Sequence, residues 1–174
     1  MPQGPGGPDE QWVIKVLAQL GKGEADCQLA RARPLGEDAG RWDDWVEFFV
    51  DACEYKIQPR ESHERGFRLA TLSLTSKDML RDRVYGIRET LFHDPYYQRH
   101  VVAAPLITSI DGDVIASQAN YAVFRTKPDG VSSVFNVGRY VDRSVFVDAG
   151  RLKFLSRHCI FDSEMIPNSL IYPI

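Results

Sequence analysis

Two histidines and one aspartate lie within eight positions of each other in the segment LFHDPYYQRHVV, residues 91–102. His93, Asp94 and His100 are the ligand types of a non-haem iron centre, which binds two histidines and one carboxylate. However, Pro95 restricts the residue before it to extended conformations, so His93 is expected at a helix end and His100 at the start of a strand. The spacing therefore favours another interpretation, in which His93 complements a helix dipole and His100 is a hydrogen-bonded histidine at the head of a strand.

A second candidate chemistry is proton transfer by an Asp/His pair inside an apolar cavity, where burial tunes the pKa values of both groups. The candidates are Asp43 or Asp44 together with His100, and also His158. His158 is predicted to share one strand face with Leu152, Phe154, Ser156 and Ile160. A single histidine on a largely apolar strand face is more often structural than catalytic, and the sequence leaves both interpretations open.

The N-terminal elements are predicted from composition and hydrophobic periodicity. Residues 1–10 hold three prolines and three glycines, which predicts a disordered leader. Residues 11–20 have the spacing of a short amphipathic helix, and residues 21–39 predict an irregular connector. Residues 40–174 are expected to form a single domain. It begins with helices over 41–52 and 77–91, the second with Ser76 as its N-cap.

The remaining segments predict strands, namely 53–59, 69–76, and four long runs at 98–110, 113–127, 131–146 and 152–163, with a charged loop at 60–67. Turn-forming sequences that contain Asp and Gly separate the long runs. Pro105, inside the first long run, predicts an edge or a bulge because proline cannot donate to a strand ladder. The pattern predicts an α+β fold, with N-terminal helices packed on a long curved antiparallel sheet.

Composition excludes several functional classes. The chain has 174 residues, with 21 Lys and Arg against 24 Asp and Glu, so it offers no broad positive field for nucleic acid. Cys27, Cys53 and Cys159 are odd in number and widely spaced, which favours a reduced compartment over a disulfide framework. No apolar run approaches the ~20 residues of a membrane span, and the first residues do not form a signal peptide. We expect a cytoplasmic protein without a membrane segment.

Several segments resemble the small (beta) subunits of bacterial aromatic-ring-hydroxylating oxygenases, the Rieske non-haem iron enzymes. They are GRWDDWVEFFVDACEYKIQPRE (40–61), SKDMLRDRVYGIRETLFHDPYYQRHVV (76–102), ANYAVFRTKPDGVSSVFNVGRYVD (119–142) and RHCIFDSEMIPNSLIYPI (157–174). They look most similar to the small subunits of salicylate 5-hydroxylase and anthranilate dioxygenase. The first 39 residues depart from the pattern, because Pro34 and Gly36 interrupt a helix that is continuous in relatives. The resemblance implies the nuclear-transport-factor-like cone fold.

The resemblance also implies a structural small subunit that is not itself catalytic. Its partner would be a large subunit that holds a Rieske 2Fe–2S cluster and a mononuclear Fe(II), in an assembly of three large and three small subunits. Electrons would come from NAD(P)H through ferredoxin and reductase components, and the substrate would be a salicylate-, benzoate- or anthranilate-like aromatic acid in aromatic catabolism. This chain lacks the paired Cys-x-His and Cys-x-x-His motifs of a Rieske centre, so we expect no cofactor, metal or catalytic residue in it.

The resemblance places candidate subunit contacts in the segment after the second helix and in the last residues of the chain. Tyrosine and arginine are enriched in interface cores. The candidates are Tyr96, Tyr97, Arg99, His100 and Tyr172. Two other functions stay open on the sequence: a stand-alone cone-fold isomerase or dehydratase that uses an Asp/His pair, and a non-catalytic ligand-binding module of the same fold.

Overall fold

The computed structural model describes residues 38, 40–147, 151–166 and 169–174. The predicted leader and short helix, and all of the predicted connector except Asp38, lie outside the described residues. In chain order the elements are α3 (Trp42–Glu47), β1 (Phe49–Pro59), α4 (Arg60–Glu64), β2 (Leu72–Leu74), α5 (Lys77–Tyr85), the π-helical turn η1 (Gly86–Thr90), β3 (Tyr97–Val102), β4 (Leu106–Asp111), β5 (Val114–Thr126), β6 (Ser133–Val147) and β7 (Arg151–Phe161).

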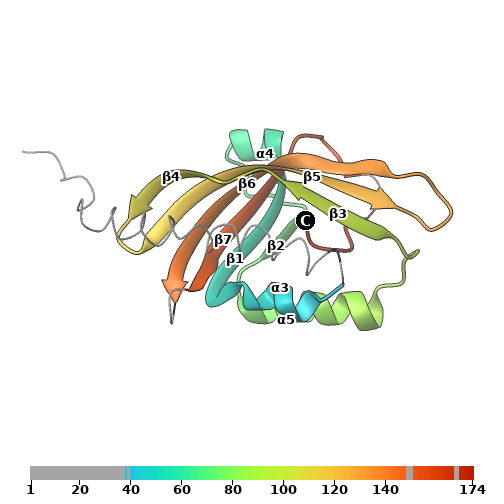
Figure 1. The fold of residues 1–174 in the computed structure, drawn as a ribbon, viewed down its shortest axis with the longest axis horizontal. Helices are drawn as coiled ribbons and strands as arrows, with labels where there is room; N and C mark the ends of the chain where they lie inside the picture. Colours follow the sequence, from blue (N-terminus) through green and yellow to red (C-terminus); the bar gives the residue numbers. More distant parts are fainter. Residues whose placement is uncertain (1–37, 39, 148–150, 167–168) are drawn as a thin grey trace, which may run out of the picture.

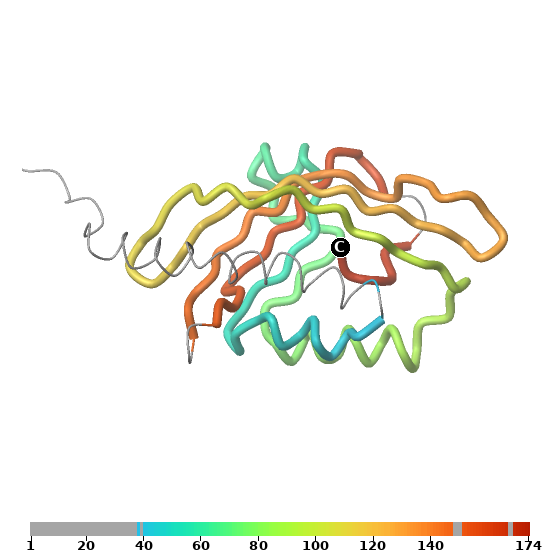
Figure 2. The backbone as a smooth tube through the Cα atoms, in the orientation of Figure 1, coloured from blue at the N-terminus to red at the C-terminus, as the bar shows by residue number. Residues whose placement is uncertain are grey.

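One curved sheet of seven strands forms the body of the molecule, in the order β2-β1-β7-β6-β5-β3, with β4 also paired to β5. The sheet curves over α3 and α5, whereas α4 lies on its other side (Figure 1). The long β5 and β6 strands run side by side along most of the molecule (Figure 2). This arrangement confirms the predicted α+β fold.

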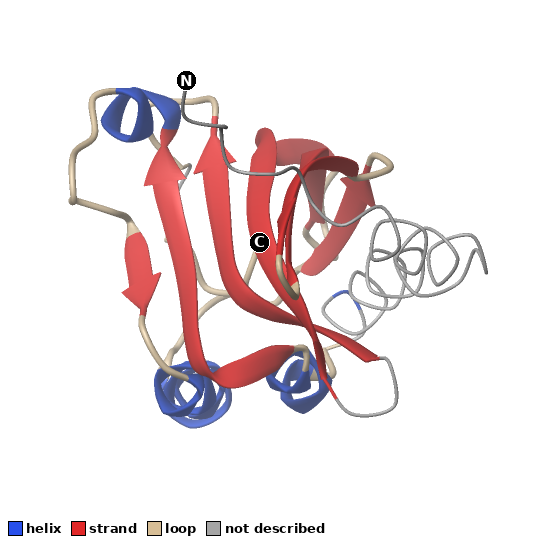
Figure 3. Cartoon of the chain, turned by 90° about the vertical axis from the view of Figure 1, so that its left-hand side faces the viewer, coloured by secondary structure: helices blue, strands red, loops and turns tan. Residues whose placement is uncertain are grey.

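The sequence predicted a wholly antiparallel sheet, which was wrong, because β1 and β7 pair in parallel. These are the first and last long strands of the described chain, and they lie next to each other in the cartoon of Figure 3. Parallel neighbours need a long connection, and here all the elements from α4 to β6 lie between them. Turn-forming sequences cannot predict this pair, because no short turn connects β1 to β7.

The first helix ends earlier than predicted. Strand β1 already begins at Phe49, whereas the sequence predicted a helix over 41–52. Phe49, Cys53, Tyr55 and Ile57 are all buried, and from Cys53 onward the spacing is the two-residue period of a strand with one face in the core. Trp45 meets Phe49 and Tyr55 edge-on, with ring centroids 5.6 and 5.2 Å apart. The aromatic residues therefore divide between helix and strand while sharing one core.

The predicted N-cap of the second helix is confirmed. The hydroxyl of Ser76 accepts a hydrogen bond from the backbone N–H of Met79 at 3.3 Å, so Ser76 is the N-cap of α5. The single strand predicted over 98–110 was wrong: Pro105, expected at an edge or a bulge, lies in a break between β3 and β4, and both of these strands pair with β5. The charged segment 60–67, predicted as a loop, begins instead with the one-turn helix α4.

A bulge in β7 changes which residues face the core. The pairing of β6 with β7 shifts in register between Arg143 and Ser144, opposite Phe154 and Ser156. As a result Phe154 and Arg157 lie on the same side, with the Arg157 guanidinium 4.3 Å from the Phe154 ring centroid. His158 therefore faces away from the core side. The prediction that His158 shares a face with Leu152 and Phe154 was wrong for this reason.

None of the described helices is long and apolar enough to cross a membrane.

Candidate functional site

His100 forms a buried pair with Asp38. Its Nδ1 lies 2.9 Å from Asp38 Oδ1, and the two side chains are only 1% and 8% exposed. The backbone N–H of His100 also donates to both carboxylate oxygens of Asp38 at 3.2 Å. Strand β3 pairs with β5 on one side, so Asp38 satisfies a donor on the other edge of this strand. Burying either side chain without a hydrogen-bond partner would cost roughly several kcal/mol. Each of the two residues therefore stabilises the buried position of the other.

Gln98 occupies the other ring nitrogen of His100. The side-chain Nε2 of Gln98 lies 3.2 Å from His100 Nε2 and donates to the carbonyl oxygen of Pro173 at 2.7 Å. With the Nδ1 proton of His100 donated to Asp38, its Nε2 accepts from Gln98. A general base needs a ring nitrogen that can reach its substrate. In this arrangement both ring nitrogens of His100 are already hydrogen-bonded.

The segment 169–174 closes the interior of the cone. The Tyr55 hydroxyl donates to the carbonyl oxygen of Ile174 at 2.9 Å and accepts from its backbone N–H at 2.8 Å. The guanidinium of Arg83 donates to the carbonyl oxygens of Leu170 and Ile171 at 2.5 and 2.8 Å. Ile174 is fully buried and belongs to the main core cluster. The tail is therefore part of the packed interior of the domain.

An aromatic cluster lies beside the pair. Tyr172 stacks on Trp42 with ring centroids 4.8 Å apart, and its ring also lies 4.5 Å from Tyr96 and 5.2 Å from His93. Burial raises the pKa of Tyr96 to about 12, so its hydroxyl stays protonated near neutral pH.

A pocket of about 390 Å³ opens next to this cluster, lined by Asp38, Gly40, Trp42, Tyr96, Tyr97, Gln98 and Tyr172. The pocket contains one carboxylate, and that carboxylate is bonded to His100.

The three residues of the possible iron site do not come together. Asp94 is exposed and binds Lys127, whose Nζ lies 3.0 Å from Asp94 Oδ2; this hydrogen bond lowers the pKa of Asp94. His93 packs on tyrosine rings, while His100 pairs with Asp38. Among the described residues there is no group of three His, Cys, Asp or Glu side chains placed to hold a metal ion.

The described cysteines do not fit an iron–sulfur cluster either. Cys53 and Cys159 are both buried in the core. A Rieske centre needs two cysteines and two histidines around one cluster, and the described part of the chain does not bring such a set together.

The other candidate acid–base residues have different partners. Asp43 binds Arg88 at 2.8 Å and Asp44 binds Arg41 at 2.9 Å, both near the surface. His158 Nε2 lies 3.3 Å from Glu54 Oε2. The sequence therefore predicted that His100 could belong to an Asp/His pair, but it did not identify Asp38 as the partner. Asp38 precedes Gly40 in a segment without periodicity, so no sequence signal marked it.

A buried ion pair lies on the core side of β6 and β7. Arg157 Nη2 lies 2.6 Å from Asp142 Oδ2, with the side chains 5% and 7% exposed. The Arg157 guanidinium lies between the rings of Tyr140 and Phe154, 4.1 and 4.3 Å from their centroids. Flat contact of a guanidinium with aromatic rings stabilises the buried charge.

The candidate interface residues divide between the surface and the interior. Along β3, Tyr97 is 71% exposed and Arg99 is also exposed, whereas Gln98 and His100 are buried. Tyr96 and Tyr172 are partly buried in the aromatic cluster. The two-residue period of the strand thus presents Tyr97 and Arg99 outward. Their role in assembly stays a prediction.

Comparison with known proteins agrees with the fold and assigns the family. The SnoaL-like domain family matches residues 27–158, and the cone is shared with nuclear-transport-factor-like proteins. The small subunit of anthranilate 1,2-dioxygenase from Burkholderia cepacia is 30% identical over 150 residues, which are 86% of this chain and 92% of that protein. Subunit beta 1 of the terminal oxygenase component of terephthalate 1,2-dioxygenase from Comamonas sp is 27% identical, covering 86% and 96% of the two chains.

A crystal structure from Novosphingobium aromaticivorans, assigned as the beta subunit of an aromatic-ring-hydroxylating dioxygenase, superposes with a TM-score of 0.80. It is 34% identical and covers 92% of this chain and 99% of its own. The anthranilate and terephthalate relatives are subunits of dioxygenases, and thus components of oxidoreductase complexes. The chain belongs to the family of small (beta) subunits of aromatic-ring-hydroxylating dioxygenases.

Proposed function

We propose that this chain is the structural, non-catalytic small subunit of a multicomponent oxygenase that oxidises an aromatic acid in aromatic catabolism. The main support is that side chains of this protein occupy the interior of the cone. Asp38 and Gln98 are hydrogen-bonded to the two ring nitrogens of His100, and Ile174 is buried in the core. The substrate class is supported by the relatives' names, since anthranilate and terephthalate are both aromatic acids.

In this proposal the redox chemistry belongs to the large subunit. That subunit would hold the Rieske 2Fe–2S cluster and the mononuclear Fe(II), and NAD(P)H would supply electrons through ferredoxin and reductase components in the cytoplasm. Three large and three small subunits would form the assembly. The small subunit would act as a rigid platform, because its long β5–β6 and β6–β7 pairings resist bending. Tyr97 and Arg99 would contact a neighbouring subunit.

The test is to produce this chain alone, its large-subunit partner alone, and the two together. We expect iron and oxygenase activity to follow the large subunit, with full activity and a stable assembly only when both are present. Stoichiometric iron in the isolated small chain would overturn the proposal. So would an active large subunit whose activity and stability are unchanged when the small chain is omitted.

One observation favours a second function, a stand-alone isomerase or dehydratase. Asp38 and His100 form a buried Asp/His pair beside a pocket of about 390 Å³. Proton-transfer enzymes use pairs of this kind. Against it, a substrate would have to displace Gln98 from His100 Nε2. Two measurements separate the two functions. A stand-alone enzyme requires proton-transfer activity from the isolated wild-type chain. Under the structural proposal that chain is inactive, and Gln98→Ala, which exposes His100 Nε2, lowers stability without creating activity.

A further inference from the structure

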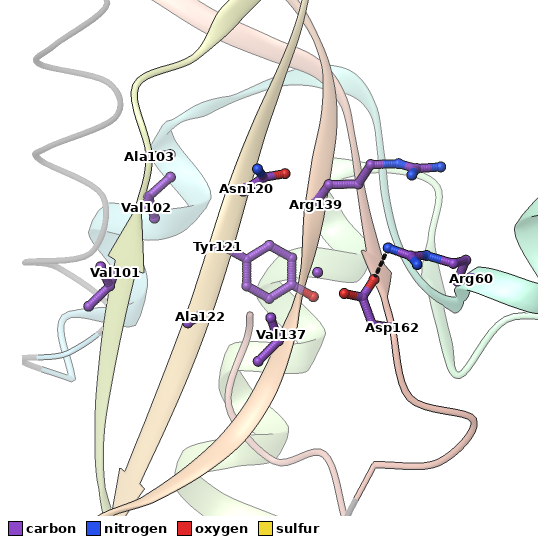
Figure 4. Close-up of a pocket in the computed structure, with 11 residues that line it drawn as sticks. Arg60, Val101, Val102, Ala103, Asn120, Tyr121, Ala122, Val137, Arg139 and Asp162 are labelled. Carbon is purple, nitrogen blue, oxygen red and sulfur yellow. Dashed lines mark ion pairs between the residues drawn. The ribbon is translucent and has the colours of Figure 1, made fainter.

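A groove lies on the face of the sheet that is turned away from the core. It has a volume of about 550 Å³ and is lined mainly by strands β3, β5 and β6, with Arg60 and Asp162 on one side (Figure 4). Val101, Ala122 and Val137 are neighbours in one row across these strands. The adjacent row, His100, Val123 and Asn136, is buried. Because strand side chains alternate, the first row faces outward.

The groove combines a small apolar floor with one cation, Arg139, for which the described residues provide no partner of opposite charge. Ala103 and Ala122 leave space between the exposed side chains of Val101 and Val137, which are 56% and 43% exposed. Arg60 is already paired, since its Nη2 lies 2.6 Å from Asp162 Oδ1.

Arg139 also lines the groove, and in the described part of the chain no carboxylate lies within salt-bridge distance of it. Figure 4 shows Arg139 extending beside the Arg60–Asp162 pair without joining it.

The openness of the groove favours a polypeptide over a small molecule. Small-molecule sites bury about 70–90% of their ligand, but here the valine walls are themselves half exposed. A second copy of this chain would not complement the groove face to face, because its carboxylate, Asp162, is already bound to Arg60. Two such grooves in contact would bring Arg139 near another Arg139. The complementary surface instead carries an apolar side chain beside a carboxylate.

We propose that this groove docks a segment of the large subunit, with an apolar side chain on the Ala103 and Ala122 floor and a carboxylate paired with Arg139. The inference rests on the proposed function, because it names the surface through which the small subunit would hold its catalytic partner. It also adds residues beyond Tyr97 and Arg99, neither of which lines the groove.

Two variants test the groove. Ala122→Trp fills the floor of the groove, and Arg139→Glu reverses the charge at its edge. The matched control is Arg143→Glu on the same strand, because Arg143 is exposed and lies outside the groove. Binding of each purified chain to the purified large subunit is measured at one fixed salt concentration. Thermal unfolding of each isolated chain shows whether the variants are folded.

We expect Ala122→Trp and Arg139→Glu to weaken binding about 30-fold, the loss typical of one central interface residue. Arg143→Glu is expected to bind like the wild type. Unchanged binding by both groove variants would overturn the docking site while leaving the proposed function intact. A wild-type chain that does not bind the large subunit would refute the proposed function and the docking site together. If the variants instead abolished self-association of the isolated chain, the occupant would be a second copy and the inference would be wrong.

Discussion

The hydroxyl of Tyr55 holds both backbone polar groups of Ile174, donating to its carbonyl oxygen at 2.9 Å and accepting from its N–H at 2.8 Å. The two residues are 119 positions apart, and Tyr55 has no exposed surface. One side chain of β1 therefore fixes the tail inside the cone. The neighbouring Gln98 binds the carbonyl oxygen of Pro173 in the same way from β3.

Replacing Tyr55 with Phe keeps the ring and removes both of these hydrogen bonds. The polar backbone groups of Ile174 would lose this partner in a dry environment, so we expect a loss of about 2 kcal/mol in the free energy of unfolding. Urea unfolding measures the loss. Tyr85→Phe is the control, because Tyr85 is 63% exposed. Equal midpoints for Tyr55→Phe and wild type would show that the tail does not depend on this contact.

Gly138 is required by the close approach of β7. A Cβ at this position would lie 2.1 Å from the carbonyl oxygen of Ile160 and 2.8 Å from the Cα of Phe161. Backbone cannot move aside cheaply, so Gly138→Ala is expected to destabilise the chain by about 3 kcal/mol. Gly130→Ala meets nothing closer than 3.7 Å and serves as the control. Similar thermal midpoints for the two variants would contradict this account.

Acid should weaken the link between α3 and α5. The carboxylate of Glu47 lies 2.9 Å from the buried Nζ of Lys77, and this hydrogen bond lowers the pKa of Glu47 below its ordinary value of 4.5. A pKa that is lower in the folded state contributes stability above the unfolded pKa, and the contribution is lost as the pH falls through the folded pKa. Because Glu47 is largely exposed, the contribution is expected to be under about 1 kcal/mol.

Unfolding midpoints of wild type and Glu47→Gln between pH 3 and 6 check this link. The difference between them is expected to be largest above about pH 5 and to shrink in more acidic solution. Glu89→Gln, on the exposed side of η1, provides the comparison. A difference that stays constant with pH would rule out an ionic contribution from Glu47.

Tyr97→Ala and Arg99→Ala are expected to weaken the assembly with the large subunit, since both side chains point outward from β3 and tyrosine and arginine dominate interface energetics. Size-exclusion chromatography with light scattering on the co-expressed subunits measures the mass of the complex. Tyr85→Ala, exposed on α5, is the matched control. A complex of unchanged mass, at unchanged stability of the variant chains, would exclude this contact surface.

The sequence by itself determined the local features of the fold. Ser76 caps α5 because its hydroxyl accepts from an N–H three residues away. Pro105 marks an irregular place in the strand run because proline lacks an N–H, although the full break between β3 and β4 was not predicted. The α+β order followed from periodicity, and the family followed from the resemblance of four segments. Each of these depends on residues that are near each other in the chain, where spacing translates directly into geometry.

Only the tertiary structure decided the contacts between distant segments. The parallel pairing of β1 with β7, the partnership of Asp38 with His100 across 62 positions, and the burial of Ile174 have no local signal. The bulge in β7 places His158 on the face away from the core. One extra residue reverses the alternation of inward and outward side chains on which the prediction for His158 was based. The groove around Arg139 likewise exists only because curvature brings β3, β5 and β6 beside Arg60 and Asp162.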